Sequence, residues 1–463
     1  MTYPDRSLPR PFRDLIDDRN AAAIHADVER TQKQRQQLVR LQDESEQAQL
    51  IPILQRRREN TDAVVRFEVA GTTHGPALVV PREILLRGAS NQDFTVADEI
   101  LQQAGFVQRG LVDQPFGCAE LADRLRVFTG PAEADLDVVR DTVGKLSDAG
   151  FDAAPTAVLV LHPVVKATAS PTPSKRRPPA SGQSPEGRIV VAVIDTGIAE
   201  KLRGDGWLNE VERRADNIDP LDAFGGNPSG PNGLLDFAAA HGHFAAGIVR
   251  QVDPEAEIRS YLALDSDGFG SEVSVACAMI RAAKEGAHVV NMSLGMGTID
   301  NEPCLAFETA LDLIDEMFEG REPPVFVASA GNYGDERLVW PAASPRVISV
   351  AALAKHPKNG SQFEPAEWSS RGEWVSCSTI GEGILSTYVE GLEDPVFEDN
   401  DEYPPDAWAV WSGTSFAAPQ IAGAISRKCR ELNLPPRAAA DELISSGIPI
   451  PDFGQGLQIL PGS

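Results

Sequence analysis

A short segment near the C-terminal end surrounds one hydroxyl group with small residues: Trp411-Ser412-Gly413-Thr414-Ser415-Phe416-Ala417-Ala418-Pro419. The apolar run 421–425 follows at once and predicts a buried helix. Ser415 would then lie at the N-terminus of this helix, where unpaired N–H groups and the helix dipole favour a developing negative charge. Taken alone, the segment is weak evidence for a nucleophile, because small residues before a helix are usually just a tight cap. A role as nucleophile requires a base, an orienting acid and an oxyanion donor from elsewhere in the chain.

The totals exclude some classes of function. The 463 residues are enough for two or three domains with a sizeable core. The formal net charge of −26 argues against a nucleic acid or an anionic membrane as the main partner, because both attract basic surfaces. Residues 1–6 form no apolar signal segment, and no later apolar run is long enough to span a bilayer. We therefore expect a cytoplasmic location.

The cysteines are few, odd in number and widely scattered. No CxxC pair or Cys/His cluster suggests zinc, so we expect no metal cofactor and a reduced compartment. The five positions are Cys118, Cys277, Cys304, Cys377 and Cys429.

The N-terminal part of the chain divides into two units. Residues 1–60 form a helical segment with a thin apolar stripe, which favours a helix docked on its own domain over one that binds a regulatory partner. Residues 61–167 alternate strands and helices and predict a small α+β domain in which no motif carries chemistry. Its expected strands lie at 64–69, 77–80 and 156–161, and its expected helices at 94–103 and 135–149.

Residues 168–187 are rich in Pro and Ser and predict an extended, exposed linker. The triplet Lys175-Arg176-Arg177 is open to two interpretations, a processing site or charge in a flexible tether, and the second is favoured.

Residues 188–463 have a different pattern of apolar and polar residues. Mostly apolar strands alternate with helices, which predicts an α/β domain whose parallel sheet is covered by helices on both faces. Sites in such sheets gather outside the carboxyl ends of the strands. The expected strands are 189–194, 257–264, 288–292 and 325–328, and the expected helices between them are 273–285 and 304–319.

Three polar residues lie at strand ends or helix starts in this domain. Asp195 follows the first strand, His241 opens a helix rich in small residues, and Asn332 follows the fourth strand. Taken singly, they suit a capping or metal-binding Asp, a structural His and a turn Asn. His243 lies two residues after His241, a spacing that also suits a metal, but no carboxylate or Cys stands at ligand spacing beside the pair.

Taken together with Ser415, these residues make the domain resemble the subtilisin-like serine proteases, or subtilases. The family's order, Asp then His then Ser, is kept. The resemblance implies that Ser415 attacks a peptide carbonyl, that His241 takes its proton, that Asp195 orients His241, and that Asn332 and the Ser415 N–H hold the oxyanion. The matching segments are Ile194–Gly197, His241–Gly247, Asn291–Gly295, Ala330–Asn332 and Gly413–Pro419.

The resemblance also implies two substrate-binding edges, Ser293-Leu294-Gly295 and Gly268-Phe269-Gly270, which would pair with an extended peptide. Simple glycine turns are the alternative. The sequence departs from the family where His243 and Phe244 replace the Thr and His that many relatives carry. A polar insertion at 217–233 could bind calcium, but its carboxylates are few.

Residues 61–167 stand where many subtilases carry a pro-domain that blocks the cleft, and a regulatory or partner-binding domain is the alternative. The acidic segment 382–404 suits either the rim of the cleft or a solvated loop. We expect a cytoplasmic serine endopeptidase acting on protein or peptide substrates and regulated by its N-terminal region. Two other hypotheses stay open: an inactive subtilase fold that serves as a scaffold, and a protease activated by a partner at the N-terminal helix.

Overall fold

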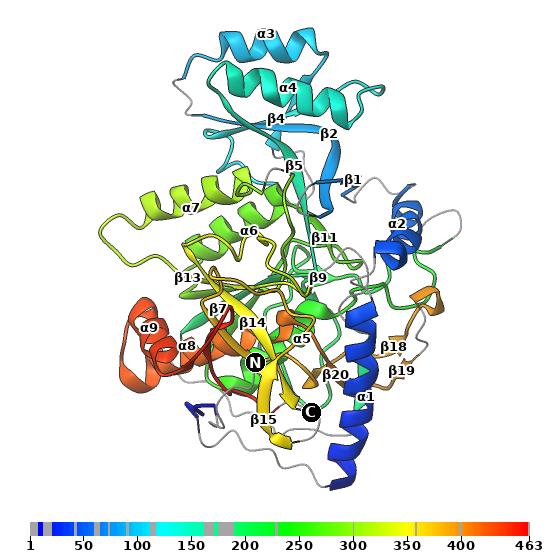
Figure 1. Ribbon diagram of the computed structural model, residues 1–463, viewed down its shortest axis with the longest axis vertical. Coiled ribbons are helices and arrows are strands. Elements are labelled where there is room, and N and C mark those ends of the chain that lie inside the picture. The colour runs from blue at the N-terminus through cyan, green and yellow to red at the C-terminus, as the bar shows by residue number, and fades with distance from the viewer. Residues whose placement is uncertain are drawn as a thin grey trace.

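The computed structural model describes residues 8–12, 21–40, 44–59, 65–72, 75–88, 92–111, 117–161, 171–174, 189–226, 230–299, 301–356, 359–397 and 401–461. A large α/β body carries a small α+β domain, and a helical arm runs along the side of the body (Figure 1).

The body is built on a mainly parallel sheet with strand order β10-β7-β12-β13-β14-β16-β22-β21, and β15 pairs with β14. Neighbouring strands from β10 to β22 run parallel, whereas the pairs β14–β15 and β21–β22 are antiparallel. The predicted α/β fold is thereby confirmed. The strands are β7 (Val190–Asp195), β10 (Glu257–Leu262), β12 (Val289–Met292), β13 (Val325–Ser329), β14 (Val347–His356), β15 (Asn359–Pro365), β16 (Cys377–Ile380), β21 (Ile448–Ile450) and β22 (Gly454–Gly456).

Helices cover both faces of this sheet because its strands are apolar on both sides. Ala192 and Ile194 of β7 belong to the core that α6 and α7 share, whereas Val191 and Val193 belong to the core under α5 and α8. The carboxyl ends of the strands and the helix starts that follow them therefore face one edge. The helices are α5 (His241–Val252), α6 (Glu272–Lys284), α7 (Leu305–Met317), α8 (Ala418–Leu432) and α9 (Pro436–Ser445).

Short elements line the edge of the body. A 3₁₀ turn, η3 (Thr414–Phe416), leads into α8, and β17 pairs with β20 just before it. The others are β8 (Ile198–Ala199), β9 (Ile218–Asp219), β11 (Phe269–Ser271), β17 (Ile384–Thr387), β18 (Gly391–Leu392), η2 (Pro395–Phe397), β19 (Glu402–Tyr403) and β20 (Trp408–Trp411).

The small domain shares its sheet with the body. The strand order is β11-β5-β2-β4-β3, with β1 beside β2, so β11 of the body forms one edge. Ile84 and Leu86 pack under α3 and α4, whereas Leu85 faces the core of the body. Figure 1 shows β5 reaching from this domain into the body. The elements are β1 (Glu68–Ala70), β2 (Ala77–Arg87), α3 (Thr95–Gln103), β3 (Val107–Arg109), β4 (Leu125–Thr129), α4 (Leu136–Asp148) and β5 (Asp152–Val160).

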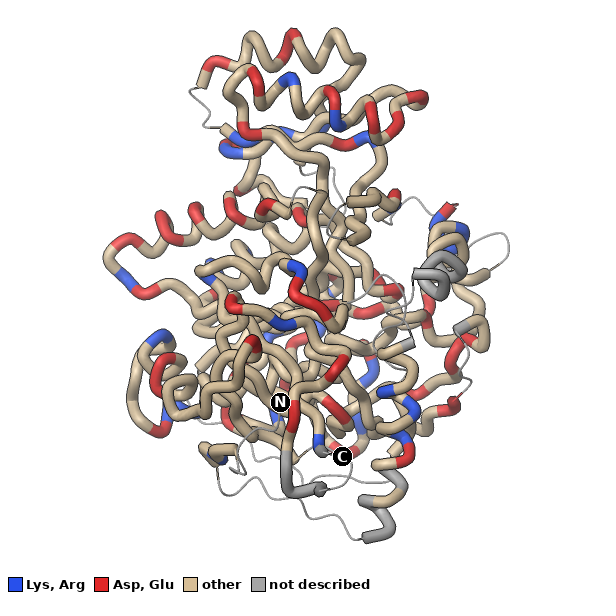
Figure 2. The backbone as a smooth tube through the Cα atoms, in the orientation of Figure 1, with Lys and Arg blue, Asp and Glu red and all other residues tan. Residues whose placement is uncertain are grey.

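The acidic residues of α7 face this domain in part. Figure 2 shows Asp and Glu side by side along α7. Arg124 binds Glu316 at 2.9 Å, and Arg87 binds Asp312, so two of these carboxylates form ion pairs with the small domain.

The N-terminal arm consists of α1 (Ala21–Arg40) and α2 (Glu44–Arg58) and is docked on its own body. The Gln34 side chain donates to the Val410 carbonyl oxygen at 2.8 Å and accepts from the Ser412 hydroxyl at 2.7 Å. Arg35 binds the buried carboxylate of Glu382, with Nε 2.7 Å from Oε1. Glu382 is therefore held inside the structure and is not part of a solvated loop.

Part of the linker is ordered, contrary to the expectation of an exposed chain. β6 (Thr172–Ser174) adds to β20 as an antiparallel strand, because the edge of β20 offers unpaired backbone groups. The basic triplet at 175–177 lies outside the described residues.

The cysteines also differ from expectation. Cys118 and Cys277 form a disulfide, so the prediction that the cysteines are all reduced is wrong for this pair. Cys304, Cys377 and Cys429 are buried thiols. In the part of the chain that the structure describes, no helix combines the length and apolarity that a membrane crossing requires.

Candidate active site

Asp195 and His241 meet at the carboxyl edge of the sheet. Nδ1 of His241 lies 2.9 Å from Oδ1 and 3.0 Å from Oδ2 of Asp195, and neither side chain is exposed. The backbone N–H of Thr196 also donates to Oδ1 of Asp195 at 2.8 Å. The carboxylate therefore has donors on both sides, which compensates for its burial at the end of β7.

The imidazole of His241 is held in place by the backbone turn before α5 and by neighbouring aromatic rings. The preceding Ala240 has a φ of 62°, a left-handed conformation that a residue with a Cβ rarely adopts, and it turns the chain into α5. The ring packs against Trp411 and Phe416, with centroids 5.4 and 5.1 Å away. Its Nε2 is buried and has no hydrogen-bond partner among the described residues. A buried nitrogen without a partner is costly, and such atoms gather at functional sites.

Ser415 lies in η3, directly before α8, as the sequence predicts. Its hydroxyl donates to the Ser293 carbonyl oxygen at 3.2 Å and is fully buried. In this state the hydroxyl is therefore directed to Ser293 instead of His241. Ser293 in turn donates its own hydroxyl to the Ser415 carbonyl oxygen at 2.8 Å, which fixes the backbone of the 3₁₀ turn.

Asn332 holds the same turn from the other side. Its Oδ1 accepts from the Thr414 N–H at 2.9 Å and from the Thr414 hydroxyl at 2.8 Å. With Oδ1 taken, Nδ2 is the donor end of this amide, and a Cβ placed on Gly413 would lie 3.6 Å from it. The amide nitrogen thus lies beside the loop that carries Ser415, where an oxyanion donor is required.

Both predicted substrate-binding edges are occupied by the chain itself. Gly295 donates its N–H to the Val160 carbonyl oxygen at 2.9 Å, and Leu161 donates to the Gly268 carbonyl oxygen at 3.2 Å. β11 pairs with β5 in antiparallel register, with Phe269 opposite Val160. Residues 158–161 therefore lie between the two edges as an inserted strand.

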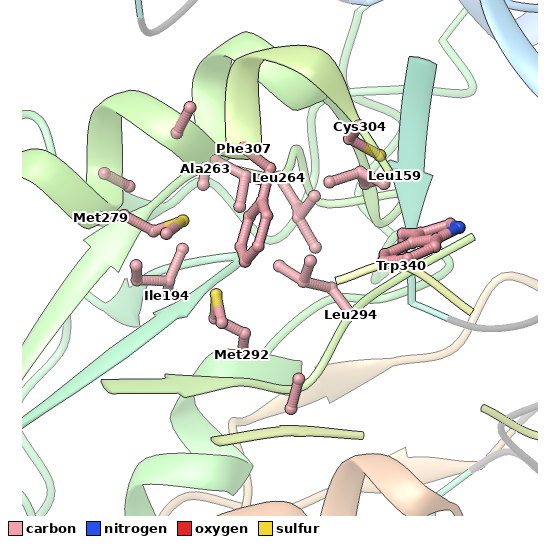
Figure 3. Close-up of a cluster of buried hydrophobic side chains, with 14 of the residues drawn as sticks. Leu159, Ile194, Ala263, Leu264, Met279, Met292, Leu294, Cys304, Phe307 and Trp340 are labelled. Carbon is pink, nitrogen blue, oxygen red and sulfur yellow. The ribbon is translucent and has the colours of Figure 1, made fainter. Parts of the chain in front are cut away.

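The side chain of Leu159 completes this insertion. It is fully buried in one cluster with Leu264, Leu294 and Trp340, and Figure 3 shows it among these residues. The small domain therefore contributes an apolar side chain to the core of the body. The linker strand β6 pairs with β20, the strand that precedes the turn of Ser415.

Asp219 is a buried residue that the sequence did not single out. It accepts from the Thr196 hydroxyl at 2.7 Å and from the Ala240 N–H at 2.9 Å, and burial raises its pKa to about 7. Thr196 accepts the Gly242 N–H at 3.1 Å, so Asp219 positions the first turn of α5. Its only sequence signal was the polar insertion at 217–233. The described residues contain no group of three or more His, Cys, Asp or Glu that could hold a metal.

His243 does not take part in this arrangement. It is buried, and burial lowers its pKa to about 3, so it is neutral. Its ring nitrogens have no partner in the part of the molecule that the structure describes.

Sequence comparison decides the family. A model of the subtilase family of peptidases matches residues 187–446, which is more than half of the chain. The protein belongs to the subtilase family. This subtilase is 32% identical to the thermophilic serine proteinase of Bacillus sp. (strain AK1) over 235 residues, or 50% of each chain. Fervidolysin of Fervidobacterium pennivorans is 30% identical over 259 residues, or 51% of this subtilase and 34% of fervidolysin.

Thermitase of Thermoactinomyces vulgaris is 29% identical over 269 residues, or 54% of this subtilase and 78% of thermitase. The matched segment thus spans half or less of the length of the first two relatives. The crystal structure of fervidolysin, a keratinolytic enzyme related to subtilisin, has a TM-score of 0.52 at 19% identity and covers 83% of this subtilase and 60% of that chain. The likeness of fold therefore extends beyond the family segment.

Proposed function

We propose that this subtilase is a serine endopeptidase whose own N-terminal domain blocks its cleft. The observation that carries the proposal is the hydrogen bond between Asp195 and His241, and the occupation of the edges at 268–270 and 293–295 by residues 158–161 supports the block. The inactive-scaffold alternative is disfavoured, because a scaffold has no need for Asp195, His241, Asn332 and Ser415 in one place.

The proposed reaction begins when the inserted strand leaves. The Ser415 hydroxyl rotates from the Ser293 carbonyl oxygen to Nε2 of His241, which has no competing partner among the described residues. Ser415 Oγ attacks the peptide carbonyl and its proton passes to Nε2, while Asp195 stabilises the imidazolium through Nδ1. Nδ2 of Asn332 and the Ser415 N–H bind the oxyanion.

The second half of the reaction returns the groups to their first state. The tetrahedral intermediate collapses as Nε2 of His241 gives its proton to the leaving amine, and an acyl ester forms on Ser415. Water then takes the place of the amine, and the same two residues release the acid. No cofactor is needed for either half.

The substrates we propose are proteins or peptides bound as an extended strand. The two edges at 268–270 and 293–295 offer the backbone groups that now hold Val160 and Leu161. Leu159 is buried in one apolar cluster with Leu264, Leu294 and Trp340, so we expect a large apolar side chain to be favoured at that position of the substrate.

Latency follows from the same contacts, since the intact chain fills its own cleft. Activation by a partner remains the second candidate, favoured by the docked arm, because anything that displaced Gln34 from Val410 and Ser412 would loosen the loop before Ser415. The cytoplasmic location stays a prediction, and the Cys118–Cys277 disulfide favours an oxidising compartment instead.

A fluorophosphonate probe, which labels activated serines, tests the proposal. We expect slow labelling of the intact chain, fast labelling after the N-terminal domain has been removed, and none in Ser415→Ala. His241→Ala should also prevent labelling, whereas His243→Ala, as the matched control, should not. Labelling of Ser415→Ala at the wild-type rate, or none of any wild-type form, would contradict the proposal.

A further inference from the structure

We propose that the Cys118–Cys277 disulfide is a thiol-exchange site that keeps the blocking domain tied to the peptidase domain after the chain between them is cut. The inference deepens the proposed function and rests on it. Small thiols and protein dithiols would react with this disulfide. Their reaction would release the blocking domain from the cleft.

The position of the disulfide carries the argument. Cys118 lies in the turn segment before β4 of the small domain, and Cys277 lies inside α6 of the body. The two are 159 residues apart in sequence, and the loop between them contains β5, the inserted residues 158–161 and the linker. A backbone cut anywhere in that loop therefore leaves both parts covalently joined.

A blocking domain that stays covalently joined to the peptidase domain competes strongly with substrate for the cleft. Its strand is held by Gly295 and Gly268, and its Leu159 is buried in the apolar core of the body. Once the backbone is cut, the disulfide keeps this strand at a high effective concentration near the cleft, which strengthens its hold without any new contact. The surface pair of Lys284 and Glu120, 2.7 Å apart and half exposed, adds little by comparison. Cleavage alone is then insufficient for activity.

The disulfide can be reached from solvent. A cavity of about 540 Å³ is lined by both cysteines together with Glu120, Tyr261, Arg281 and Lys284. Cys118 is half-buried, whereas Cys277 is 5% exposed. Because Cys118 is the more exposed residue of the pair, we expect an incoming thiolate to attack there first.

The exchange balances in two steps. A thiolate attacks Sγ of Cys118, the S–S bond breaks, and Cys277 leaves as a thiolate that takes up a proton. A second thiolate attacks the outer sulfur of the mixed disulfide on Cys118, which frees Cys118 as a thiol. Two external thiols are oxidised to one disulfide, and the cystine is reduced to two cysteines.

The test uses the full chain purified without reductant. Bead-bound trypsin cuts at the basic triplet 175–177 of the linker and is then removed. We expect one band on a non-reducing gel and two on a reducing gel. Fluorophosphonate labelling of Ser415 should rise at least about tenfold when a dithiol is added to the cut chain. Cut Cys118→Ser should label quickly without dithiol, and Cys429→Ser should behave like the wild type.

Either of two results would overturn the inference: free thiols at both Cys118 and Cys277 by mass spectrometry of the purified chain, or equal labelling of the cut chain with and without dithiol. If the proposed function itself is wrong, the experiment gives a different result. In that case Ser415 is never labelled, even in cut Cys118→Ser, while the gels still report whether the parts are joined.

Discussion

The buried carboxylate of Glu272 accepts the backbone N–H of Ala157 at 2.7 Å, so a residue at the start of α6 holds the blocking strand β5. Its other oxygen accepts the Ala306 N–H of α7, also at 2.7 Å. One side chain thus joins the N-terminal domain to two helices of the body. Burial raises the pKa of Glu272 to about 7, and repulsion from Glu83 on β2 contributes.

We predict that the blocking domain binds more weakly as the pH rises from about 5 to 7. In the complex the pKa of Glu272 is raised, so binding takes up a proton in this window and loses up to about tenfold in affinity per pH unit. The measurement is dissociation of the domain from cut, reduced Ser415→Ala. Glu272→Gln should bind more weakly at pH 5 and depend less on pH, and Glu133→Gln, on the surface, should match its parent. A Glu272→Gln curve that runs parallel to the parent would exclude this role.

We predict that Leu161→Pro releases the cleft more than Leu161→Ala does. Both substitutions remove a buried side chain, but only proline also removes the N–H that donates to Gly268. A lost buried hydrogen bond costs about 1–3 kcal/mol, so Leu161→Pro should be labelled roughly 5- to 150-fold faster than Leu161→Ala by the fluorophosphonate probe. Equal rates for the two variants would mean that this backbone contact does not hold the strand.

We predict that Asn332→Ala lowers kcat by about 10²–10³ with little change in KM, because the donor acts on the oxyanion. Asn332→Asp separates this role from a structural one. It keeps the acceptor for Thr414 but loses the amide donor and adds a negative charge. The aspartate variant should therefore keep the Thr414 contacts, lose some stability because its new carboxylate is buried, and be at least as slow as Asn332→Ala. Full activity of Asn332→Asp would rule out the oxyanion role.

We predict that Arg58→Met destabilises the protein, and more so at pH 8 than at pH 5. The guanidinium binds Asp265 at 2.7 Å and Asp267 at 3.0 Å and lies 4.2 Å over the Phe269 ring. Its loss leaves buried carboxylates without this partner, at a cost of about 3–5 kcal/mol.

The direction of this pH dependence follows from the titration of Asp265. Burial already raises its pKa to about 6, and loss of Arg58 raises it further. Protonation at pH 5 therefore removes most of the penalty. Thermal unfolding at the two pH values measures the loss of stability, and Arg109→Met, at an exposed position, is the control. A loss of stability that is the same at both pH values would show that packing, and not charge, accounts for the effect.

Much of the peptidase fold could be predicted because its strands are buried on both faces. β7 and β13 are apolar up to a polar last residue, Asp195 or Ser329, where the chain leaves the sheet, and β12 is apolar except for Asn291. The pairing of Cys118 with Cys277 left no such pattern, because only the docking of two domains brings these residues together. The Thr-Pro-Ser of β6 likewise gives no clear strand signal, because Pro is depleted in strands, and the open edge of β20 determines its conformation.

The backbone N–H of Gly295 donates a hydrogen bond to the Val160 carbonyl oxygen. It can exchange with deuterium only when the strand lifts, so its protection factor gives the free energy of opening in the intact molecule, without substrate or probe. The same amide is the group that a bound peptide would engage. The exchange of a single backbone amide would therefore report the fraction of uncut molecules in which the strand has lifted from this edge.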